Sequence, residues 1–370
     1  MLTSFRALPR ILTVLPLLLP LSGCYLMQAA SGQMEIVSKR QPIAEVVADS
    51  STPADLRARL EYVRAARDFA SHELGLPDND SYRSYADVGR PYVIWNVFAT
   101  SEFSVEPRRW CFPIAGCVVY RGYFSEGAAQ SYARRLRLHG DDTAVGGVAA
   151  YSTLGHFKDP VLNTMMSWSD AQIAATLFHE LAHQVAYVAG DSEFNEAFAT
   201  VVEETGLERW LASRDRSAEL LAWRTQRQRG SQFIALLLRT RDRLRELYSS
   251  GLPPAQMRER KQYVFGELKL EYAQLRRTWD GYGGYDHFFD RTLNNAHLVS
   301  AATYYGCVPG LQRLLQQSGG DLPRFYERVR ELTRLDAQAR AGAVCSDSPP
   351  PAMLPVSRSE TPASSSRAGS

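Results

Sequence analysis

The chain has 370 residues, a formal net charge of +2, 45% hydrophobic residues and 22% charged residues. This balance is typical of a folded globular protein, and the length is sufficient for a sizeable buried core. The nearly neutral charge excludes the strongly basic class of protein that binds nucleic acid, so no nucleic-acid partner is expected.

The N-terminus carries an export signal. Two arginines precede an apolar run over residues 11–21, which is too short to span a bilayer and is typical of a cleaved signal peptide. The run ends in Leu-Ser-Gly-Cys at Cys24, which resembles a bacterial lipobox. The resemblance implies removal of residues 1–23 and lipidation of the Cys24 thiol. A plain export signal with a chance cysteine is the alternative.

Lipidation would decide where the protein resides. Acyl chains on Cys24 would anchor the mature chain to a membrane. Tyr25 follows in place of an Asp, which resembles the sorting pattern of lipoproteins in the outer membrane. We therefore expect an exported, lipid-anchored envelope protein that faces the periplasm.

The first part of the mature chain predicts one helix and then several strands. Residues 53–75 begin with Pro and end with Gly, as a helix does. Aromatic and β-branched residues over 92–98 and 116–120 predict strands, and a helix follows Ser125. Residues 148–154 predict an edge strand, of the kind that can pair with an extended peptide.

Four cysteines remain after Cys24. Export permits disulfides, and four cysteines allow three connectivities. The short loop from Cys111 to Cys117 makes these two the favoured pair, which leaves Cys307 to bond Cys345. Zinc binding is the rival interpretation, but the C-x-x-C spacing that would support it does not occur.

The next helix carries the most informative motif of the chain. Residues 171–189 are rich in Ala and Leu and contain no Gly or Pro, so they predict a helix. Ser169 with Gln172 forms a capping box at its start, and Gly190 is a stop signal after its end. Within this helix the sequence from His179 is His-Glu-Leu-Ala-His.

This motif predicts a zinc site with a general base. His179 and His183 are four residues apart, so both imidazoles project from one face of a helix and can bind one metal ion. Glu180 is placed to take a proton from a zinc-bound water, whose pKa the metal lowers to about 7. Two hydrogen-bonded core histidines would be the structural alternative.

A catalytic zinc ion usually has a third protein ligand. The metzincin pattern would require Gly at 186 and His at 189, and the chain has Ala186 and Ala189 instead. A second helix is predicted from an N-cap at Ser192 to about Trp210. If the two helices fold back about Gly190, residues at equal distances from this turn face each other.

Glu196 is the third ligand that this geometry selects, because it lies level with His183. Glu193 is too near the turn, and Glu204 lies about two turns too far along the second helix. Glu203, seven residues after Glu196, shares its face and is expected to support a ligand from behind or to be a solvated charge.

The rest of the chain completes the expected architecture. Charged, Leu-rich stretches at 217–249 and 255–278 predict amphipathic helices. Ser, Pro and Ala dominate residues 346–370, which we interpret as a disordered tail. We expect a predominantly helical α+β fold with a small mixed or antiparallel sheet and an active-site helix. A single domain is expected over residues 24–345, with the sheet and metal helices at about 85–215 and a helical remainder at about 216–345.

Three stretches of sequence carry a family resemblance. They are His-Glu-Leu-Ala-His-Gln at 179–184, Phe-Asn-Glu-Ala-Phe-Ala-Thr at 194–200, and Asn-Asn-Ala-His-Leu at 294–298, which runs into Ala-Thr-Tyr at 302–304. They resemble the bacterial predicted zinc aminopeptidases, a gluzincin-like group, over about residues 40–340. The resemblance implies a zincin-like core and peptide substrates.

The resemblance also implies roles for particular residues. One zinc ion would be held by His179, His183 and Glu196, with Glu180 as the base. Peptide hydrolysis needs a donor for the oxyanion as well. Tyr304, Tyr305 and His297 in the third motif are the candidates, and the resemblance favours Tyr304. Core packing is the alternative for each tyrosine.

The leading hypothesis is therefore a lipid-anchored zinc peptidase, an aminopeptidase by its resemblance. A non-catalytic zinc-binding envelope lipoprotein with a structural or partner-binding role is the alternative, and a fourth ligand from His156 or Glu203 would then close the site. An aminopeptidase needs an acidic group for the substrate's α-ammonium. The sequence does not rank Asp191, Glu193 and Glu203 for that role, and it does not reveal the oligomeric state.

Overall fold

The structure of the protein is a computed structural model that describes residues 20–112, 116–150, 152–153, 155, 157–302 and 307–345. Over these residues the fold is α+β and mostly helical, with small mixed and antiparallel sheets. The predicted fold class is thus confirmed. None of the helices described is both long and apolar enough to cross a membrane.

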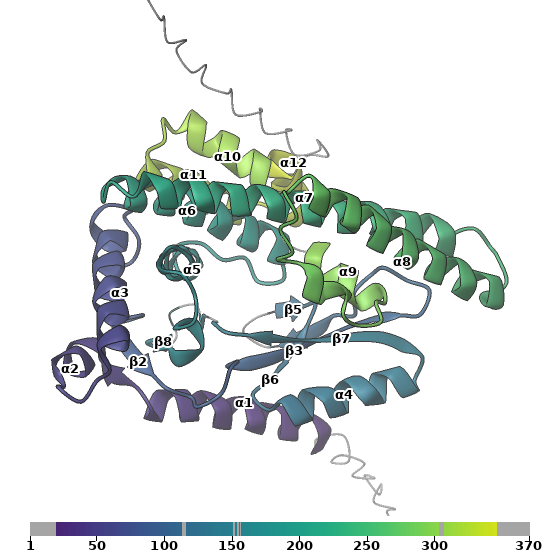
Figure 1. Ribbon diagram of the computed structural model, residues 1–370, viewed down its shortest axis with the longest axis horizontal. Helices are drawn as coiled ribbons and strands as arrows, with labels where there is room; N and C mark the ends of the chain where they lie inside the picture. The colour runs from purple at the N-terminus through teal and green to yellow at the C-terminus, as the bar shows by residue number, and fades with distance from the viewer. Residues whose placement is uncertain are drawn as a thin grey trace, which may run out of the picture.

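An antiparallel sheet with the order β6-β3-β7 forms one layer (Figure 1). Its central strand pairs with the edge strand β7 from Ile94 opposite Val148 to Ser101 opposite Asp141. A helix packs on the sheet through the buried residue Ala129, and the Ser125 side chain accepts a hydrogen bond from the first turn of that helix. The bounds are β3 (Ile94–Ser101), β6 (Arg121–Tyr123), α4 (Glu126–Leu138) and β7 (Asp141–Val148).

A small mixed sheet with the order β1-β2-β8 ties the N-terminal elements to the core. β1 pairs antiparallel with β2, and β2 pairs parallel with β8. Buried residues of the neighbouring helices, including Ile43 and Leu60, extend the main core at this end. The bounds are α1 (Pro20–Ser38), β1 (Gln41–Pro42), α2 (Ile43–Ala48), α3 (Ala54–His72), β2 (Ser84–Ala86), β8 (Val161–Leu162) and η1 (Asn163–Met165).

Helix α5 (Asp170–Ala182) runs through the main core. Leu177, Phe178 and Leu181 are fully buried. In Figure 1 this helix is viewed nearly along its axis, with α3 on one side and α6 (Ser192–Ala212) above it. Gly206 lets α5 and α6 approach closely, because a Cβ at this position would lie 2.9 Å from the Phe178 ring.

The C-terminal half is helical, as predicted. Helices α7 and α8 form a long hairpin that extends beyond the sheet in Figure 1 and packs around a second core that includes Phe233 and Leu268. The bounds are α7 (Ser217–Tyr248), α8 (Pro254–Arg277), η2 (Asp286–Phe289), α9 (Asn295–Ala302), α10 (Val308–Gln317), α11 (Leu322–Thr333) and α12 (Ala337–Val344).

Both favoured disulfides are present. Cys111–Cys117 joins β4 (Trp110–Phe112) to β5 (Gly116–Val118), and Cys307–Cys345 joins the start of α10 to the end of α12. Gly116 has a positive φ of 72°, and a Cβ there would lie 2.8 Å from the Gly190 nitrogen. The first disulfide therefore closes a hairpin that lies directly against the turn between α5 and α6.

The prediction that the metal helix reaches residue 189 was wrong. Helix α5 ends at Ala182, with His183 as its C-cap, although Gly190 does occupy a turn with a φ of 83°. The cause lies in α6, where the Asn195 side-chain amide bonds both the N–H and the C=O of Val188 at 2.8 Å. These bonds satisfy the backbone of a non-helical segment.

Two further boundaries differ from expectation. The N-cap of α6 is Asp191 rather than Ser192, because the Asp191 carboxylate accepts the hydrogen bond from Phe194 N. The edge strand ends at Val148, and no strand occupies the described residues within 149–154. There the Asp159 carboxylate accepts a hydrogen bond from Thr153 N at 2.8 Å, which folds the segment into a loop.

Candidate metal centre

Local sequence positions the two histidines at the end of α5. The Ser169 side chain accepts a hydrogen bond from Gln172 N at 3.2 Å and begins the helix, as predicted. Buried Phe178 and Leu181 fix the rotation of the last turn, so His179 and His183 project from the same side. Their ring centroids are 4.9 Å apart.

Glu196 on α6 meets both histidines. Its carboxylate oxygens lie 3.3 Å from His179 Nε2 and 3.8 Å from His183 Nε2. The turn after α5 differs from the one expected, yet the pairing of Glu196 with His183 stands because α6 packs along α5.

These three residues form a group that could hold a metal ion, with ligand atoms within 4.8 Å of one another. Ligands of a tetrahedral zinc ion, each about 2.0–2.1 Å from it, lie roughly 3.3 Å apart. The observed separations of 3.3 and 3.8 Å therefore fit zinc with small side-chain adjustments. Two imidazoles and one carboxylate are also a donor set found in catalytic zinc sites.

Glu203 contacts the His179 ring on the side that faces away from Glu196. Its Oε2 lies 3.0 Å from His179 Nδ1, the ring nitrogen that faces away from Glu196. Its other oxygen lies 3.8 Å from Arg227. A carboxylate on the far nitrogen orients a metal-binding histidine and raises its basicity. The contact with His179 fits this role of Glu203 better than that of a solvated charge.

The pKa values of the two histidines are shifted in opposite directions. Burial and, to a smaller extent, nearby His179 lower the pKa of His183 to about 4 against the opposing effect of Glu196, so His183 is neutral as a metal ligand must be. Burial also lowers the pKa of His179, but hydrogen bonds with Glu196 and Glu203 outweigh it and raise the net pKa. The carboxylates thus favour positive charge at this position, whether it comes from a proton or a metal ion.

Glu180 has the electrostatics expected of a general base. Burial raises its pKa to about 7, with Glu196, Asp159 and Glu203 acting in the same direction and His179 against them. A base whose pKa lies near the working pH transfers protons efficiently. Within the described part of the chain, the Glu180 carboxylate has no hydrogen bond or ion pair that would occupy it.

The residues of the third motif are only partly described by the structure, and those that are described lie outside the metal group. Tyr304 and Tyr305 lie outside the described residues, as does His156. Asn295 is fully buried and donates to Glu102 O and Ser104 O at 2.9 Å, which is a structural role. His297 lies 3.0 Å from Asn294 and edge-on to Phe288 rather than in the metal group.

Sequence reasoning missed two tyrosines beside the metal group. Tyr187 lies edge-on to His183 with a centroid distance of 6.4 Å. Tyr120 follows β5, and burial and the nearby carboxylates of Glu196 and Glu180 raise its pKa. The i, i+4 spacing of Tyr187 from His183 could have indicated the first, whereas only the folded hairpin brings Tyr120 to the site.

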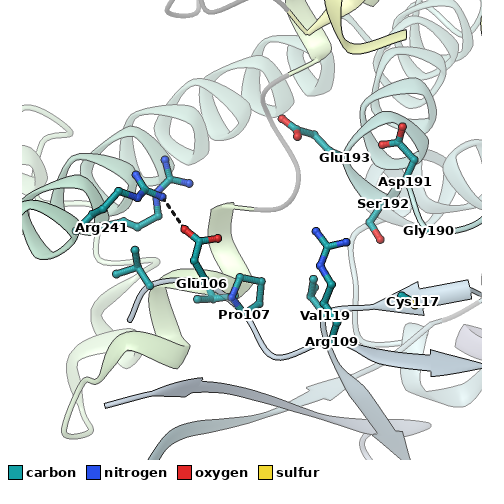
Figure 2. A pocket seen from close by; sticks show the side chains of 13 residues that line it. Glu106, Pro107, Arg109, Cys117, Val119, Gly190, Asp191, Ser192, Glu193 and Arg241 are labelled. Atoms are coloured by element: carbon teal, nitrogen blue, oxygen red, sulfur yellow. Dashed lines mark hydrogen bonds and ion pairs between the residues drawn. The ribbon is translucent and has the colours of Figure 1, made fainter. Parts of the chain in front are cut away.

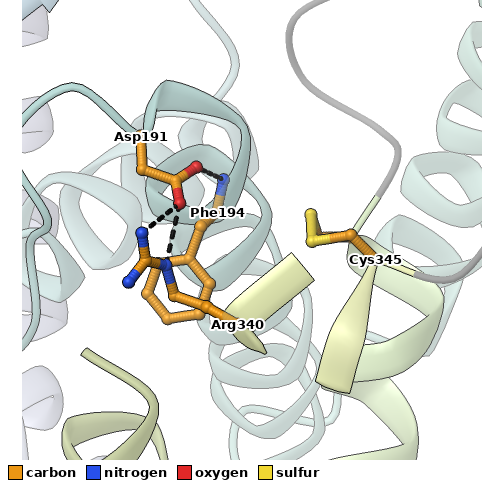
Figure 3. Close-up of a disulfide and its surroundings, with 5 residues drawn as sticks. Asp191, Phe194, Arg340 and Cys345 are labelled. Atoms are coloured by element: carbon orange, nitrogen blue, oxygen red, sulfur yellow. Dashed lines mark hydrogen bonds and ion pairs between the residues drawn. A yellow bond between two sulfur atoms is a disulfide. The ribbon is translucent and has the colours of Figure 1, made fainter. Parts of the chain in front are cut away.

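The C-terminal helix holds the start of α6 (Figure 3). Arg340 on α12 is 3% exposed and donates to Asp191 Oδ2 from Nε at 2.8 Å, with Nη2 at 2.7 Å. The other oxygen of Asp191 caps Phe194 N at 3.1 Å. Cys345, at the end of α12, is tied to Cys307, so the element that presents Glu196 is held from the C-terminal end of the chain.

Comparison with protein families gives one match. The model of a family described as "Putative aminopeptidase" matches residues 24–344. Comparison with curated proteins and with solved structures gives no match.

Proposed function

The chain belongs to the putative aminopeptidase family, and from this membership we propose that it is a zinc-dependent aminopeptidase. His179, His183 and Glu196 would hold one zinc ion per chain, and the substrate is a peptide. The observation that carries the proposal is the convergence of two imidazoles on the Glu196 carboxylate, at 3.3 and 3.8 Å, with Glu203 behind His179.

The chain supplies the groups that hydrolysis requires. A bound zinc ion would polarise the scissile carbonyl and lower the pKa of water. Glu180 would accept the proton of the attacking water and return it to the leaving amine. Tyr304 remains a proposed oxyanion donor from the family resemblance, and Tyr187 and Tyr120 are further candidates because they border the metal group.

The alternative of a closed, structural zinc site has less support. Such a site needs a fourth protein ligand. Glu203 bonds His179 Nδ1 from the far side of the ring, so it is not placed as a fourth ligand. The metal-like group found among the described residues contains three members.

Peptide hydrolysis by the wild type and a Glu180→Gln variant tests the function. We expect chelator-sensitive cleavage of unblocked peptides by the wild type. The Glu180→Gln variant should keep its zinc but lose about 10²–10⁴-fold in kcat, since its amide cannot accept the proton. Glu208→Gln, on an exposed part of α6, is the matched control and should retain activity. Equal activity of Glu180→Gln and the wild type would refute the mechanism.

We also propose that the mature protein is lipid-anchored to the envelope, at the outer membrane facing the periplasm. The lipobox ending at Cys24 supports this, and the family match begins at the same residue. Labelled palmitate should be incorporated into the wild type and not into Cys24→Ser. Recovery of both proteins in the soluble fraction without label would contradict the proposal.

A further inference from the structure

A cavity of about 220 Å3 lies beside the turn between α5 and α6. Gly190 and Ser192 line it from the turn, Val119 and Cys117 from the β4–β5 hairpin side, and Arg241 from α7. Figure 2 shows these segments around one hollow. We call it the turn cavity.

The turn cavity and the candidate metal group share helix α6. Glu193, one of its lining residues, precedes the candidate ligand Glu196 by three residues on α6. This spacing is about 4.5 Å along a helix and makes the two side chains neighbours on its surface. One amino-acid residue spans about 3.3–3.6 Å of extended chain. A substrate residue whose carbonyl lies beside Glu196 would therefore extend its amino group toward Glu193.

The structure ranks the acidic residues that could receive an α-ammonium group. Glu203 is committed to His179, and Asp191 to Arg340 and the start of α6. Glu106 also lines the cavity, but it lies 3.3 Å from Arg245. Glu193 lines the cavity without an ion pair to any described residue, so it alone of the four is available.

The turn cavity also carries an available cation. Arg241 and Arg245 lie 3.0 and 2.7 Å from Asp242, and Arg245 also lies 3.3 Å from Glu106, so each has a carboxylate partner. Arg109 has no ion pair within the described chain, and Figure 2 shows its guanidinium extending toward Ser192. Among the described residues, the cavity thus presents one carboxylate and one guanidinium that form no ion pair.

We propose that the turn cavity binds the first residue of the substrate peptide, with the α-ammonium at Glu193 and an acidic side chain at Arg109. Charge-assisted hydrogen bonds at both positions would select peptides that have a free amino terminus and begin with Asp or Glu. Water would add to the first carbonyl carbon, the C–N bond would break, and the leaving amine would take the proton. This inference rests on the proposed aminopeptidase function.

The first experiment compares one peptide in free and N-acetylated forms. Glu193→Gln should lower kcat/KM for the free form by roughly 10- to 100-fold, as expected for loss of a charged hydrogen bond. It should leave cleavage of the acetylated form and the zinc content unchanged. Glu208→Gln, on the same helix, is the control. Equal losses on both peptides, or wild-type cleavage of both at the same rate, would overturn the assignment of Glu193.

The second experiment compares peptides that begin with glutamate and with glutamine, which differ only in charge. Arg109→Gln should reduce the wild-type preference for glutamate by roughly tenfold or more. Arg134→Gln, on the exposed face of α4, is the control and should leave the preference unchanged. If the wild type has no such preference, or if Arg109→Gln retains it, Arg109 does not recognise the side chain.

Binding to the zinc-loaded Glu180→Gln variant separates this inference from the proposed function. Calorimetry should show tighter binding of the free peptide than of the acetylated one, and the difference should vanish when Glu193→Gln is added. That result, together with a wild type that hydrolyses nothing, would support the binding site and refute the enzyme. Equal binding of both peptides in an otherwise active enzyme would refute the site alone.

Discussion

At the scale of single residues, the metal group is defined by side chains that act on one another. His179 is held on one side by Glu196 at 3.3 Å and on the other by Glu203 at 3.0 Å. His183 Nδ1 is buried and has no hydrogen-bond partner in the described structure. The two histidines should therefore differ in how much their surroundings contribute to metal affinity.

The first prediction concerns Glu203→Gln. The change removes the negative charge behind His179, so zinc affinity should fall by about 10- to 100-fold. Competition with a chromogenic chelator measures the dissociation constant. Glu208→Gln is the control, because Glu208 lies on the same helix and bonds Arg224 instead. The same zinc affinity in Glu203→Gln and wild type would contradict the supporting role.

The second prediction concerns pH and His297, a group outside the metal site. Burial lowers the pKa of His297 to about 4, and the charge of Arg291 acts in the same direction. A hydrogen bond with the Asn294 backbone and the charge of Asp142 oppose this shift. Between the unfolded value of about 6.5 and pH 4, the unfolded state binds a proton that the folded state does not. Stability should therefore fall as the pH falls through this range.

Urea denaturation at several pH values measures this effect. His297→Gln should show a shallower loss of stability between pH 7 and 4, by at most about 3 kcal/mol at the acid end. Parallel curves for the wild type and His297→Gln would show that His297 does not contribute.

At the scale of elements, the start of α6 depends on the C-terminal helix. Asp191 caps α6 with one oxygen and binds buried Arg340 with the other. Loss of an N-cap costs about 1 kcal/mol, and an unpaired buried charge costs about 3–5 kcal/mol. Arg340 on α12 and the metal ligand on α6 are therefore linked through one carboxylate.

The third prediction is that Asp191→Ala destabilises the protein by about 3–5 kcal/mol, mainly because Arg340 keeps a buried charge without a partner. The double variant Asp191→Ala with Arg340→Met should be less destabilised than the sum of the two single variants. A double-mutant cycle of urea denaturation curves measures the coupling. Additive losses would show that the two side chains do not depend on each other.

Sequence reasoning succeeded for local features and failed where another element decides. The motif at His179 and the cap at Ser169 depend on neighbouring residues, and both could be predicted from spacing. The end of α5 could not, because Asn195 on α6 bonds the backbone of Val188 and holds it outside the helix. Tyr120 reaches the site only through the fold of the hairpin.

At the scale of the whole molecule, two distant parts of the chain meet at the turn between α5 and α6. The β4–β5 hairpin lies against Gly190, α12 holds Asp191, and the turn cavity opens beside them. A disulfide closes the hairpin, and another ties α12 to α10. The short loop from Cys111 to Cys117 allowed both pairings to be predicted, because it left Cys307 to bond Cys345, but it did not reveal that α12 lies beside the metal helices.

The fourth prediction is that zinc stabilises the whole protein, since a ligand that binds only the folded state favours it. At free zinc about 100 times the dissociation constant, the gain is about 2.7 kcal/mol. Chelator should therefore lower the midpoint of thermal unfolding of the wild type, and added zinc should restore it. His183→Ala should respond to neither. If chelator does not change the midpoint of thermal unfolding of the wild type, no metal binding is coupled to folding.

The zinc content of the dialysed protein tests the central claim most directly. Because His179, His183 and Glu196 form one three-residue group, elemental analysis should find about one zinc ion per wild-type chain and less than about 0.2 in His183→Ala. Less than about 0.2 zinc per wild-type chain, or an undiminished content in His183→Ala, would contradict the zinc site on which the proposed function depends.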